Sequence, residues 1–350
     1  MSLEPLASRP SRWWHFLWFS AAVFMVAAGF AFGSARSGKV EAAVNNDPRQ
    51  LQFREGSNSP GEYRFINPLL TCELSSKKEI AEFTQLKSKI QSLVDDKVYA
   101  GEAGLVSVYF DTRDGRWLTI NGNEKYFPAS LMKVPVMIAA LKVAERDPDF
   151  LRKKLTWDGK KDLNAIENFK PRKTLQPGRT YAVDELIERM VVYSDNDAGA
   201  LLLSALDGAE LEEVVTDLGL SLPQAESESL SDFMTVKQYA RFFRVLYNST
   251  YLNREMSEKA LGYLSRSDAP DGLRGDIPED VVTARKFGER AFGIEKDGPK
   301  ELHDCGIIYH PGHPYLLCVM TKGKDFARLA STVNDVFRLV YEEIDAEQVK

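Results

Sequence analysis

The sequence has no internal repeat, no long basic run and no stretch in which aromatic and basic residues alternate. The lack of a repeat excludes a solenoid or a collagen-like chain, and apolar and charged fractions of 44% and 27% exclude a disordered one. A formal net charge of −6, with no basic run, argues against a nucleic-acid-binding surface. We therefore expect a globular protein that does not bind nucleic acid.

Histidine is scarce, with four residues in the whole chain. Three of them, His303, His310 and His313, flank an expected strand and a Pro-Gly turn. No cysteine or carboxylate near them has the spacing of a metal site, so structural roles are expected. We expect neither a metal nor an organic cofactor.

Cysteine is scarcer still, and its number is odd. Cys72, Cys305 and Cys318 allow one disulfide and one free thiol, or three buried thiols. Cys305 and Cys318 would face each other if the stretch between them turns as a hairpin at Pro311 and Gly312. The sequence leaves both arrangements open.

Long apolar runs are absent except at the N-terminus. Residues 13–33 are uncharged and mostly apolar, follow Arg9 and Arg12, and begin with aromatic residues. A helix of that length spans a hydrocarbon core of about 30 Å. A cleaved signal peptide is the alternative, since small residues at 31–35 suit cleavage, but the run is long for such a segment. We expect an uncleaved transmembrane anchor.

The charge bias around this run sets its expected orientation. With residues 1–12 in the cytoplasm, the rest of the chain lies outside it at the cell membrane, although Arg36 and Lys39 weaken the bias. Residues 34–62 are polar and rich in turn formers, which is typical of a tether. The folded domain is expected over residues 63–350.

Hydrophobic periodicity predicts an α+β fold. Strand patterns occur early and late in the chain, over residues 103–110, 116–121, 280–288, 305–310 and 314–322. Helical spacing of apolar residues is seen over residues 75–94, 131–147, 183–193, 198–207, 235–248, 257–266 and 326–344. The economical architecture is one antiparallel sheet, formed from both chain ends, packed against helices and joined to an all-helical region.

One lysine lies where a lysine is costly. Lys133 stands three residues after Ser130 in an apolar helix, and a buried ammonium must be paired or lose its proton. Pro128 favours a helix start near Ser130, where free N–H groups and the helix dipole suit a nucleophile. Residues three apart share a helix face, so a neutral Lys133 amine can accept the serine proton. The motif alone is weak, because Ser75 and Lys78 repeat it in a charged stretch.

Two further motifs follow in order. Ser194, Asp195 and Asn196 occupy a break between two apolar helices, with Asp197 placed to cap the second helix. By itself this is ordinary turn chemistry.

A Lys-x-Gly motif follows on a late strand. Lys286 and Gly288 carry it, and glycine there permits close approach of a ligand or another backbone segment. Residues 321–323 are a rival match. The ordered set of three motifs is far more specific than any one of them.

In this ordered set the chain resembles the penicillin-recognising serine hydrolases, most closely the class A β-lactamases, whose signatures are Ser-x-x-Lys, Ser-Asp-Asn and Lys-Thr-Gly. The resemblance covers roughly residues 65–345, and the order of helices and strands is similar to that family's fold. It implies an acyl-enzyme on Ser130, with Lys133 as activating base or proton relay. Ser194 would pass a proton to the leaving nitrogen.

The resemblance also implies the substrate-binding groups. Asn196 would hydrogen-bond the substrate amide, and Lys286 would bind its carboxylate beside Gly288. The backbone N–H groups of Ser130 and Glu289 would form the oxyanion hole. The implied partner is a small molecule, a β-lactam or the D-alanyl end of a cell-wall peptide.

The chain departs from the family pattern at two places. Phe287 stands where the third signature has threonine, so a hydroxyl that helps to hold a substrate carboxylate is missing. Residues 219–235 lack the family's loop glutamate pattern, and Glu226 and Glu228 there are typical of solvated charge. We expect slow deacylation, as in a penicillin-binding D-alanyl peptidase. A non-catalytic wall-binding module of the same fold is the remaining alternative.

Overall fold

A computed structural model describes residues 63–67, 83–112, 116–223, 231–270, 273, 277–291, 298–311 and 313–348. The anchor and tether expected over residues 13–62 lie outside these ranges. Among the described residues, no helix has both the length and the apolarity that a membrane crossing requires. Residues 63–67 are fastened to the domain through Glu258, whose carboxylate accepts the backbone N–H groups of Arg64, Phe65 and Ile66.

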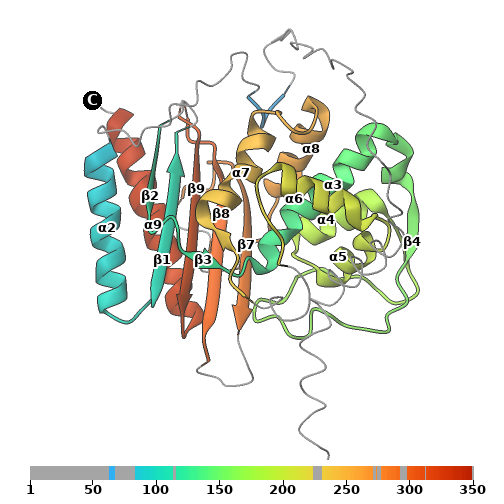
Figure 1. The fold of residues 1–350 in the computed structure, drawn as a ribbon, viewed down its shortest axis with the longest axis horizontal. Coiled ribbons are helices and arrows are strands. Elements are labelled where there is room, and N and C mark those ends of the chain that lie inside the picture. The colour runs from blue at the N-terminus through green and yellow to red at the C-terminus, as the bar shows by residue number, and fades with distance from the viewer. Residues whose placement is uncertain are drawn as a thin grey trace, which may run out of the picture.

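A five-stranded antiparallel sheet, with strand order β2-β1-β9-β8-β7, forms the centre of the described fold. Its first two strands come from the start of the domain and the other three from its end, as the sequence predicts (Figure 1). The strands are β1 (Leu105–Asp111), β2 (Trp117–Ile120), β7 (Thr283–Ala291), β8 (Lys300–Ile308) and β9 (Tyr315–Gly323).

The central strand β9 shows why both faces of the sheet must be covered. Leu316 and Met320 point into one hydrophobic cluster, whereas Leu317 and Val319 point into the other. Successive residues of a strand face opposite sides, so a continuous apolar run is the pattern of a strand buried on both faces. β7 is the edge strand on the side of the helical region.

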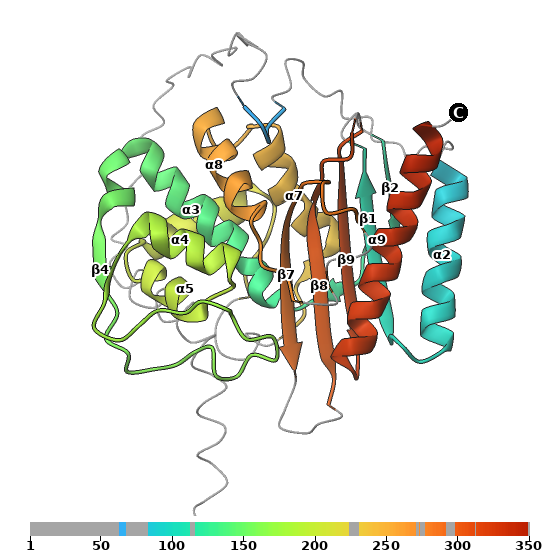
Figure 2. The same cartoon turned by 180° about the vertical axis from the view of Figure 1, so that it is seen from behind.

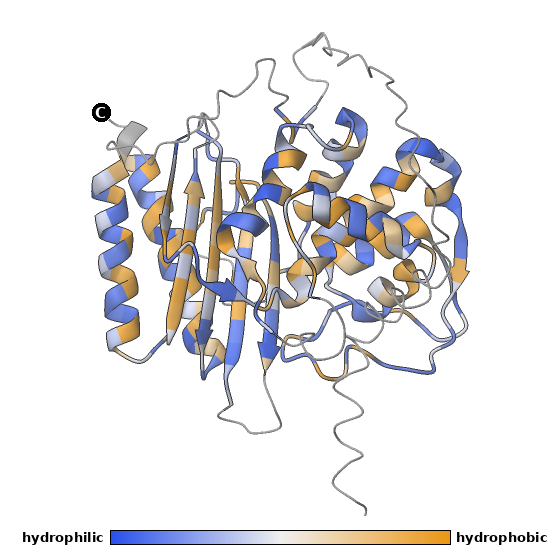
Figure 3. Ribbon diagram, viewed as in Figure 1, coloured by the Kyte–Doolittle hydropathy of each residue, from blue (hydrophilic) through white to orange (hydrophobic). Residues whose placement is uncertain are grey.

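Two helices from opposite ends of the domain cover one face. α2 (Thr84–Tyr99) and α9 (Phe326–Gln348) lie side by side against the sheet (Figure 2). Apolar and polar residues form separate bands on α2 (Figure 3), and its apolar side packs with the sheet through Leu86, Ile90 and Val94. Amphipathic spacing in the sequence predicted both helices.

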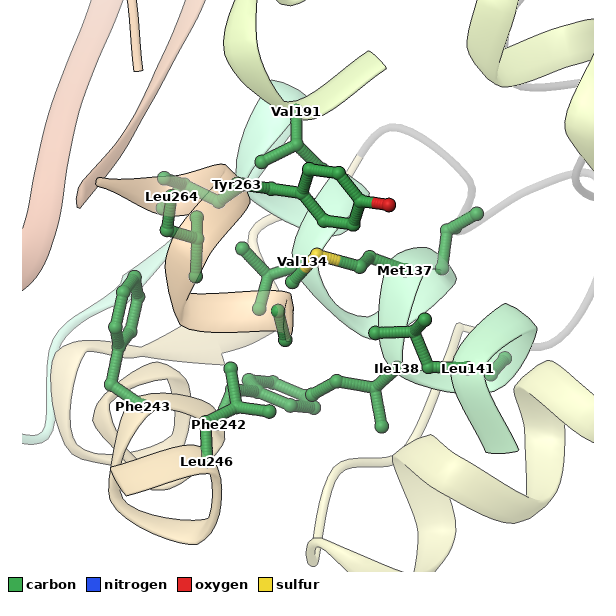
Figure 4. Packing of buried hydrophobic residues seen from close by; sticks show 14 of the residues in the cluster. Val134, Met137, Ile138, Leu141, Val191, Phe242, Phe243, Leu246, Tyr263 and Leu264 are labelled. Atoms are coloured by element: carbon green, nitrogen blue, oxygen red, sulfur yellow. The ribbon is translucent and has the colours of Figure 1, made fainter. Parts of the chain in front are cut away.

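The helical region covers the other face. It contains α3 (Lys133–Arg146), α4 (Val183–Val192), α5 (Asn196–Leu203), α6 (Gly208–Asp217), α7 (Val236–Tyr247) and α8 (Arg254–Leu264). α3 lies at its centre and is apolar nearly all round, which is why it is buried. Figure 4 shows its packing against α4, α7 and α8, through Val134, Met137, Ile138, Leu141, Val191, Phe242, Phe243, Leu246, Tyr263 and Leu264.

Short elements join these layers. They are the 3₁₀ helices η2 (Ala129–Met132) and η3 (Pro148–Arg152) and two small antiparallel pairs, β3 (Lys125–Tyr126) with β6 (Met234–Thr235) and β4 (Lys154–Thr156) with β5 (Thr180–Ala182). The sequence analysis did not predict these strand pairs or α6.

β8 and β9 form the expected hairpin. Cys305 and Cys318 are directly opposed in its register and are joined by a disulfide. Of the two cysteine arrangements that the sequence left open, the structure therefore has the one with a disulfide. Cys72 lies outside the described residues.

Candidate active site

Ser130 lies on η2, at the entrance to α3. The preceding residue, Ala129, has φ +48°, a left-handed conformation that is costly for a residue with a side chain. Leu131 is fully buried and anchors the turn, while Ser130 itself is partly exposed. A strained turn that presents one serine beside a buried helix is typical of a nucleophile held in position.

Lys133 begins α3 and is buried, with 9% of its surface exposed. Its Nζ donates to the backbone oxygen of Ser194 at 2.6 Å, to Ser194 Oγ at 3.0 Å and to Asn196 Oδ1 at 2.6 Å. Burial lowers the pKa of Lys133 to about 8, even though nearby carboxylates, Glu167 first among them, act to raise it. A sizeable fraction of neutral amine is therefore present near neutral pH.

Ser194 is the point at which two lysines meet. It has φ +59° in the turn between α4 and α5 and is 7% exposed. Lys286, from β7, is fully buried and donates from Nζ to Ser194 Oγ at 3.0 Å, the same oxygen that Lys133 contacts. Burial, followed by the charge of Lys133, lowers the pKa of Lys286 well below its ordinary value. The Ser194 hydroxyl thus links both amines in one hydrogen-bonded chain.

The rival Lys-x-Gly match at residues 321–323 lies elsewhere. Lys322 Nζ pairs with Asp232 and lies 4.9 Å from the ring centre of Tyr126. Of the two candidate lysines, it is Lys286 that the fold brings to Ser194.

Gly288 lets β7 approach η2. A Cβ at this position would lie 2.8 Å from the backbone oxygen of Pro128 and 3.0 Å from the backbone nitrogen of Leu131, closer than side chains tolerate. The glycine is therefore required for close packing of the strand against the turn that carries Ser130. Its neighbour Glu289, whose backbone N–H the sequence analysis placed in an oxyanion hole, follows directly on the same strand.

Asp195 and Asn164 hold the Ser-Asp-Asn turn in place. Asp195 caps α5, accepting from the backbone nitrogens of Asp197 and Ala198. Asn164 Nδ2 donates to Asp195 Oδ1 at 2.8 Å and to Asp197 Oδ2 at 2.9 Å, and its Oδ1 accepts from the backbone nitrogen of Asn196 at 2.8 Å. The segment around Asn164 thereby fixes the position of Asn196.

The capping role expected for Asp197 is wrong. An N-cap residue needs an extended backbone, which Asp195 has with φ −65° and ψ 115°. Asp197 already belongs to the helix, and its carboxylate accepts from the Leu163 backbone nitrogen instead. Burial raises the pKa of Asp197 to about 6.

Phe287 has an aromatic partner from a distant segment. Its ring packs edge-on against Phe169, which in turn packs against Phe326 at the start of α9. The Lys286 Nζ also lies 4.2 Å from the Phe287 ring centre, close enough for a cation–π contact. The residue that replaces the threonine is therefore part of an apolar contact at the end of β7.

Sequence reasoning missed Asn164 and Glu167, both in the irregular segment before β5. Asn196 Nδ2 donates to Glu167 Oε1 at 2.6 Å, so this carboxylate is in contact with a residue of the predicted site. The segment lacks hydrophobic periodicity and any recognised motif, so no local signal pointed to it. Glu226 and Glu228 lie outside the described residues.

Comparisons with known proteins agree with this arrangement. A family model described as the beta-lactamase enzyme family matches residues 85–344. Among curated proteins, a beta-lactamase of Streptomyces albus G is 26% identical over 254 residues, covering 67% of this chain and 78% of that protein. A beta-lactamase of Kitasatospora aureofaciens is 28% identical over 242 residues, covering 65% and 74%.

Solved structures show the same fold. An acyl-enzyme complex of a PBP-A mutant with penicillin G has a TM-score of 0.62 at 23% identity, covering 75% of this chain and 97% of that one. The fold is that of the class A β-lactamases, and the resemblance that the sequence predicted is confirmed. The chain belongs to the β-lactamase enzyme family of penicillin-recognising serine hydrolases.

Proposed function

We propose that this protein opens the amide bond of a β-lactam, or of a related cell-wall peptide, through an acyl-enzyme on Ser130. The observation that carries the proposal is the convergence of the Lys133 and Lys286 amines on Ser194 Oγ, beside the turn that presents Ser130. Two buried cations facing one hydroxyl are costly to maintain, and proton transfer is a role that accounts for them.

Acylation follows from these positions. Ser130 Oγ attacks the carbonyl carbon and gives its proton to neutral Lys133. The tetrahedral intermediate then collapses, the carbon–nitrogen bond breaks, and the leaving nitrogen takes a proton from Ser194, which is resupplied by Lys133 through their hydrogen bond. The product is an ester on Ser130, which one water molecule must hydrolyse to complete turnover.

Binding groups surround this reaction centre. The backbone N–H groups of Ser130 and Glu289 stabilise the developing oxyanion, an interaction worth about 3 kcal/mol per donor in a serine protease. Lys286 supplies positive charge for a substrate carboxylate, and Asn196 orients the substrate amide. Close packing of η2 against Gly288 supports the required proximity of the two N–H groups.

The rate of acylation should rise between pH 7 and pH 9. With a pKa of about 8, roughly a tenth of Lys133 is neutral at pH 7 and roughly nine-tenths at pH 9, so an increase of up to about tenfold is expected. Burial lowers this pKa, while the surrounding carboxyl groups of Glu167, Asp195, Glu289 and Asp197 oppose the shift. The measurement is the second-order rate constant for covalent labelling by a fluorescent penicillin at each pH.

A Lys133→Ala variant is the control for this profile. It should label about 10²- to 10⁴-fold more slowly, the usual effect of losing a general base, and without the rising limb. A variant with an unchanged profile would show that another group titrates, and no labelling at any pH would refute the proposed function itself.

A penicillin-binding D-alanyl peptidase-like protein is the second candidate function. It is favoured by Phe287, which lacks the threonine hydroxyl and is fixed by its contact with Phe169. Such a protein forms the same acyl-enzyme on Ser130 but releases it slowly. The lifetime of the acyl-enzyme separates the two candidates.

We further propose that residues 13–33 anchor the protein in the cell membrane, with the domain outside the cytoplasm. The length of the apolar run supports the anchor. The Cys305–Cys318 disulfide supports an oxidising compartment. N-terminal sequencing of the mature protein from membranes should find the apolar run still attached. A mature N-terminus near residue 35 would instead identify a cleaved signal peptide.

A further inference from the structure

Two carboxyl groups meet beside Asn196. Glu167 comes from the irregular segment before β5, and Glu289 comes from the edge strand β7. Glu289 Oε1 accepts from the Phe169 backbone nitrogen at 2.7 Å, and the two carboxyl groups are close enough to share a proton. Their meeting places two acidic side chains at a site whose other ionic partners are lysines.

The second oxygen of Glu289 has no donor. Glu289 is 7% exposed, and among the described residues nothing donates a hydrogen bond to its Oε2. A buried carboxylate oxygen without a donor is costly, at about 1–3 kcal/mol or more. Burial, with the neighbouring charge of Glu167, raises the pKa of Glu289 to about 8, so the pair holds one proton and one negative charge at neutral pH. The pair is thus ready to exchange that proton for another donor.

Glu167 also occupies a hydrogen-bond donor that the substrate needs. Asn196 Nδ2, the donor expected to hold the substrate amide carbonyl, is bonded to Glu167 Oε1 at 2.6 Å. A bound substrate must therefore take this donor from Glu167. The released carboxylate then lies next to the part of the substrate that is attached to that amide carbonyl.

We propose that Glu167 and Glu289 form a binding site for an ammonium group in the acyl part of the substrate. This inference rests on the proposed function. An ammonium brings three donors, which serve Glu167, Glu289 Oε2 and one further acceptor, and it replaces the shared proton, which leaves to solvent. The substrate class is then an amide whose acyl group carries a cationic amine close to the carbonyl.

Lys133 and Lys286 do not take this role. Lys133 is committed to Ser194 and Asn196, and Lys286 to Ser194 and the backbone oxygen of Phe287. The Glu167 charge reaches Lys133 only as one of several that raise its pKa. The acidic pair therefore remains available for a cation that arrives with the substrate.

Three penicillins that differ at one carbon test the inference. Benzylpenicillin carries hydrogen at the α-carbon of its acyl group, ampicillin an ammonium and carbenicillin a carboxylate. The experiment measures the second-order rate constant of Ser130 acylation for each at pH 6.5, where an α-amino group is mostly protonated. Ampicillin should react about 10- to 100-fold faster than benzylpenicillin, the usual effect of a hydrogen bond to a charged group, and carbenicillin should be slowest.

The Glu167→Gln variant should bring the ratio of ampicillin to benzylpenicillin close to one, because it removes the charge but keeps a side chain of the same shape. Glu212→Gln, the same change at an exposed position of α6, should retain the wild-type ratio. Melting temperatures of both variants establish that they are folded. Since the readout is a ratio within each variant, a general change in activity does not affect it.

The outcomes separate this inference from the proposed function. Equal rates for ampicillin and benzylpenicillin in the wild type, or a preference that survives Glu167→Gln, would overturn the ammonium site while leaving acylation at Ser130 intact. Labelling by none of the three penicillins would refute the proposed function, and the ammonium site with it.

Discussion

Replacing Ser130 by alanine should abolish covalent labelling by a fluorescent penicillin. Ser130 is the serine that the strained turn at Ala129 presents at the entrance to α3, one helical turn from Lys133. Removal of a serine nucleophile in a serine protease lowers turnover about 10⁶-fold, and no covalent intermediate can form without it. The measurement is in-gel fluorescence after denaturation, which reports covalent attachment alone.

Ser75→Ala is the matched control, because Ser75 begins the second Ser-x-x-Lys match of the chain. It should label like the wild type, and both variants should melt at the wild-type temperature. Equal labelling of wild type and Ser130→Ala would move the nucleophile to another residue and refute the assignment of the site.

The second large effect is expected in deacylation. Acylation uses Ser130, Lys133 and Ser194, which the chain supplies, whereas hydrolysis of the ester needs a positioned water and its own base. Residues 219–235 lack the family's glutamate pattern. Loss of a general base slows a step about 10²- to 10⁴-fold, so the acyl-enzyme should persist far longer than it takes to form.

Burst kinetics measure this difference. A chromogenic cephalosporin should give a burst of one product per protein, followed by slow turnover. Glu226→Gln and Glu228→Gln should change the slow phase little, because both residues are expected to be solvated. Fast turnover that either substitution abolishes, with acylation preserved, would instead identify the deacylating glutamate and a competent β-lactamase.

Strong periodicity made most of the fold predictable. The alternating burial of β9 and the amphipathic faces of α2 and α9 are recorded directly in the order of apolar residues, so the antiparallel sheet and its covering helices were predicted and are confirmed. α6 was missed although Asp207 and Glu210 form a capping box at its start. The two-residue strands β3 and β6 are too short to leave a periodic signal.

The site was predictable only in its motifs. Ser130, Lys133, Ser194 and Lys286 belong to short patterns that can be recognised in order, and the fold brings the last three together. Their roles in catalysis stay predictions.

The support of the site was not predictable in this way. Asn164 acts across more than thirty positions of sequence, on Asp195, Asn196 and Asp197. Glu167 reaches Asn196 from the same irregular segment. Contacts of this kind depend on the tertiary fold, and the segment that makes them has no pattern of its own.

The non-catalytic alternative depends on the same departures as slow turnover. Phe287 and the loop of residues 219–235 weaken the case for an efficient β-lactamase, but neither removes a group that acylation needs. A wall-binding module that has lost its chemistry would bind without forming a covalent bond. Covalent attachment therefore separates this alternative from both enzymatic candidates.

Intact-protein mass spectrometry during incubation with penicillin G tests the central claim most directly. We expect the protein mass to increase by one penicillin, the added mass to map to the peptide that contains Ser130, and the adduct to persist after free penicillin is removed. A transient adduct on Ser130 would identify efficient turnover. The absence of any adduct, or an adduct on a different residue, would contradict an acyl-enzyme on Ser130.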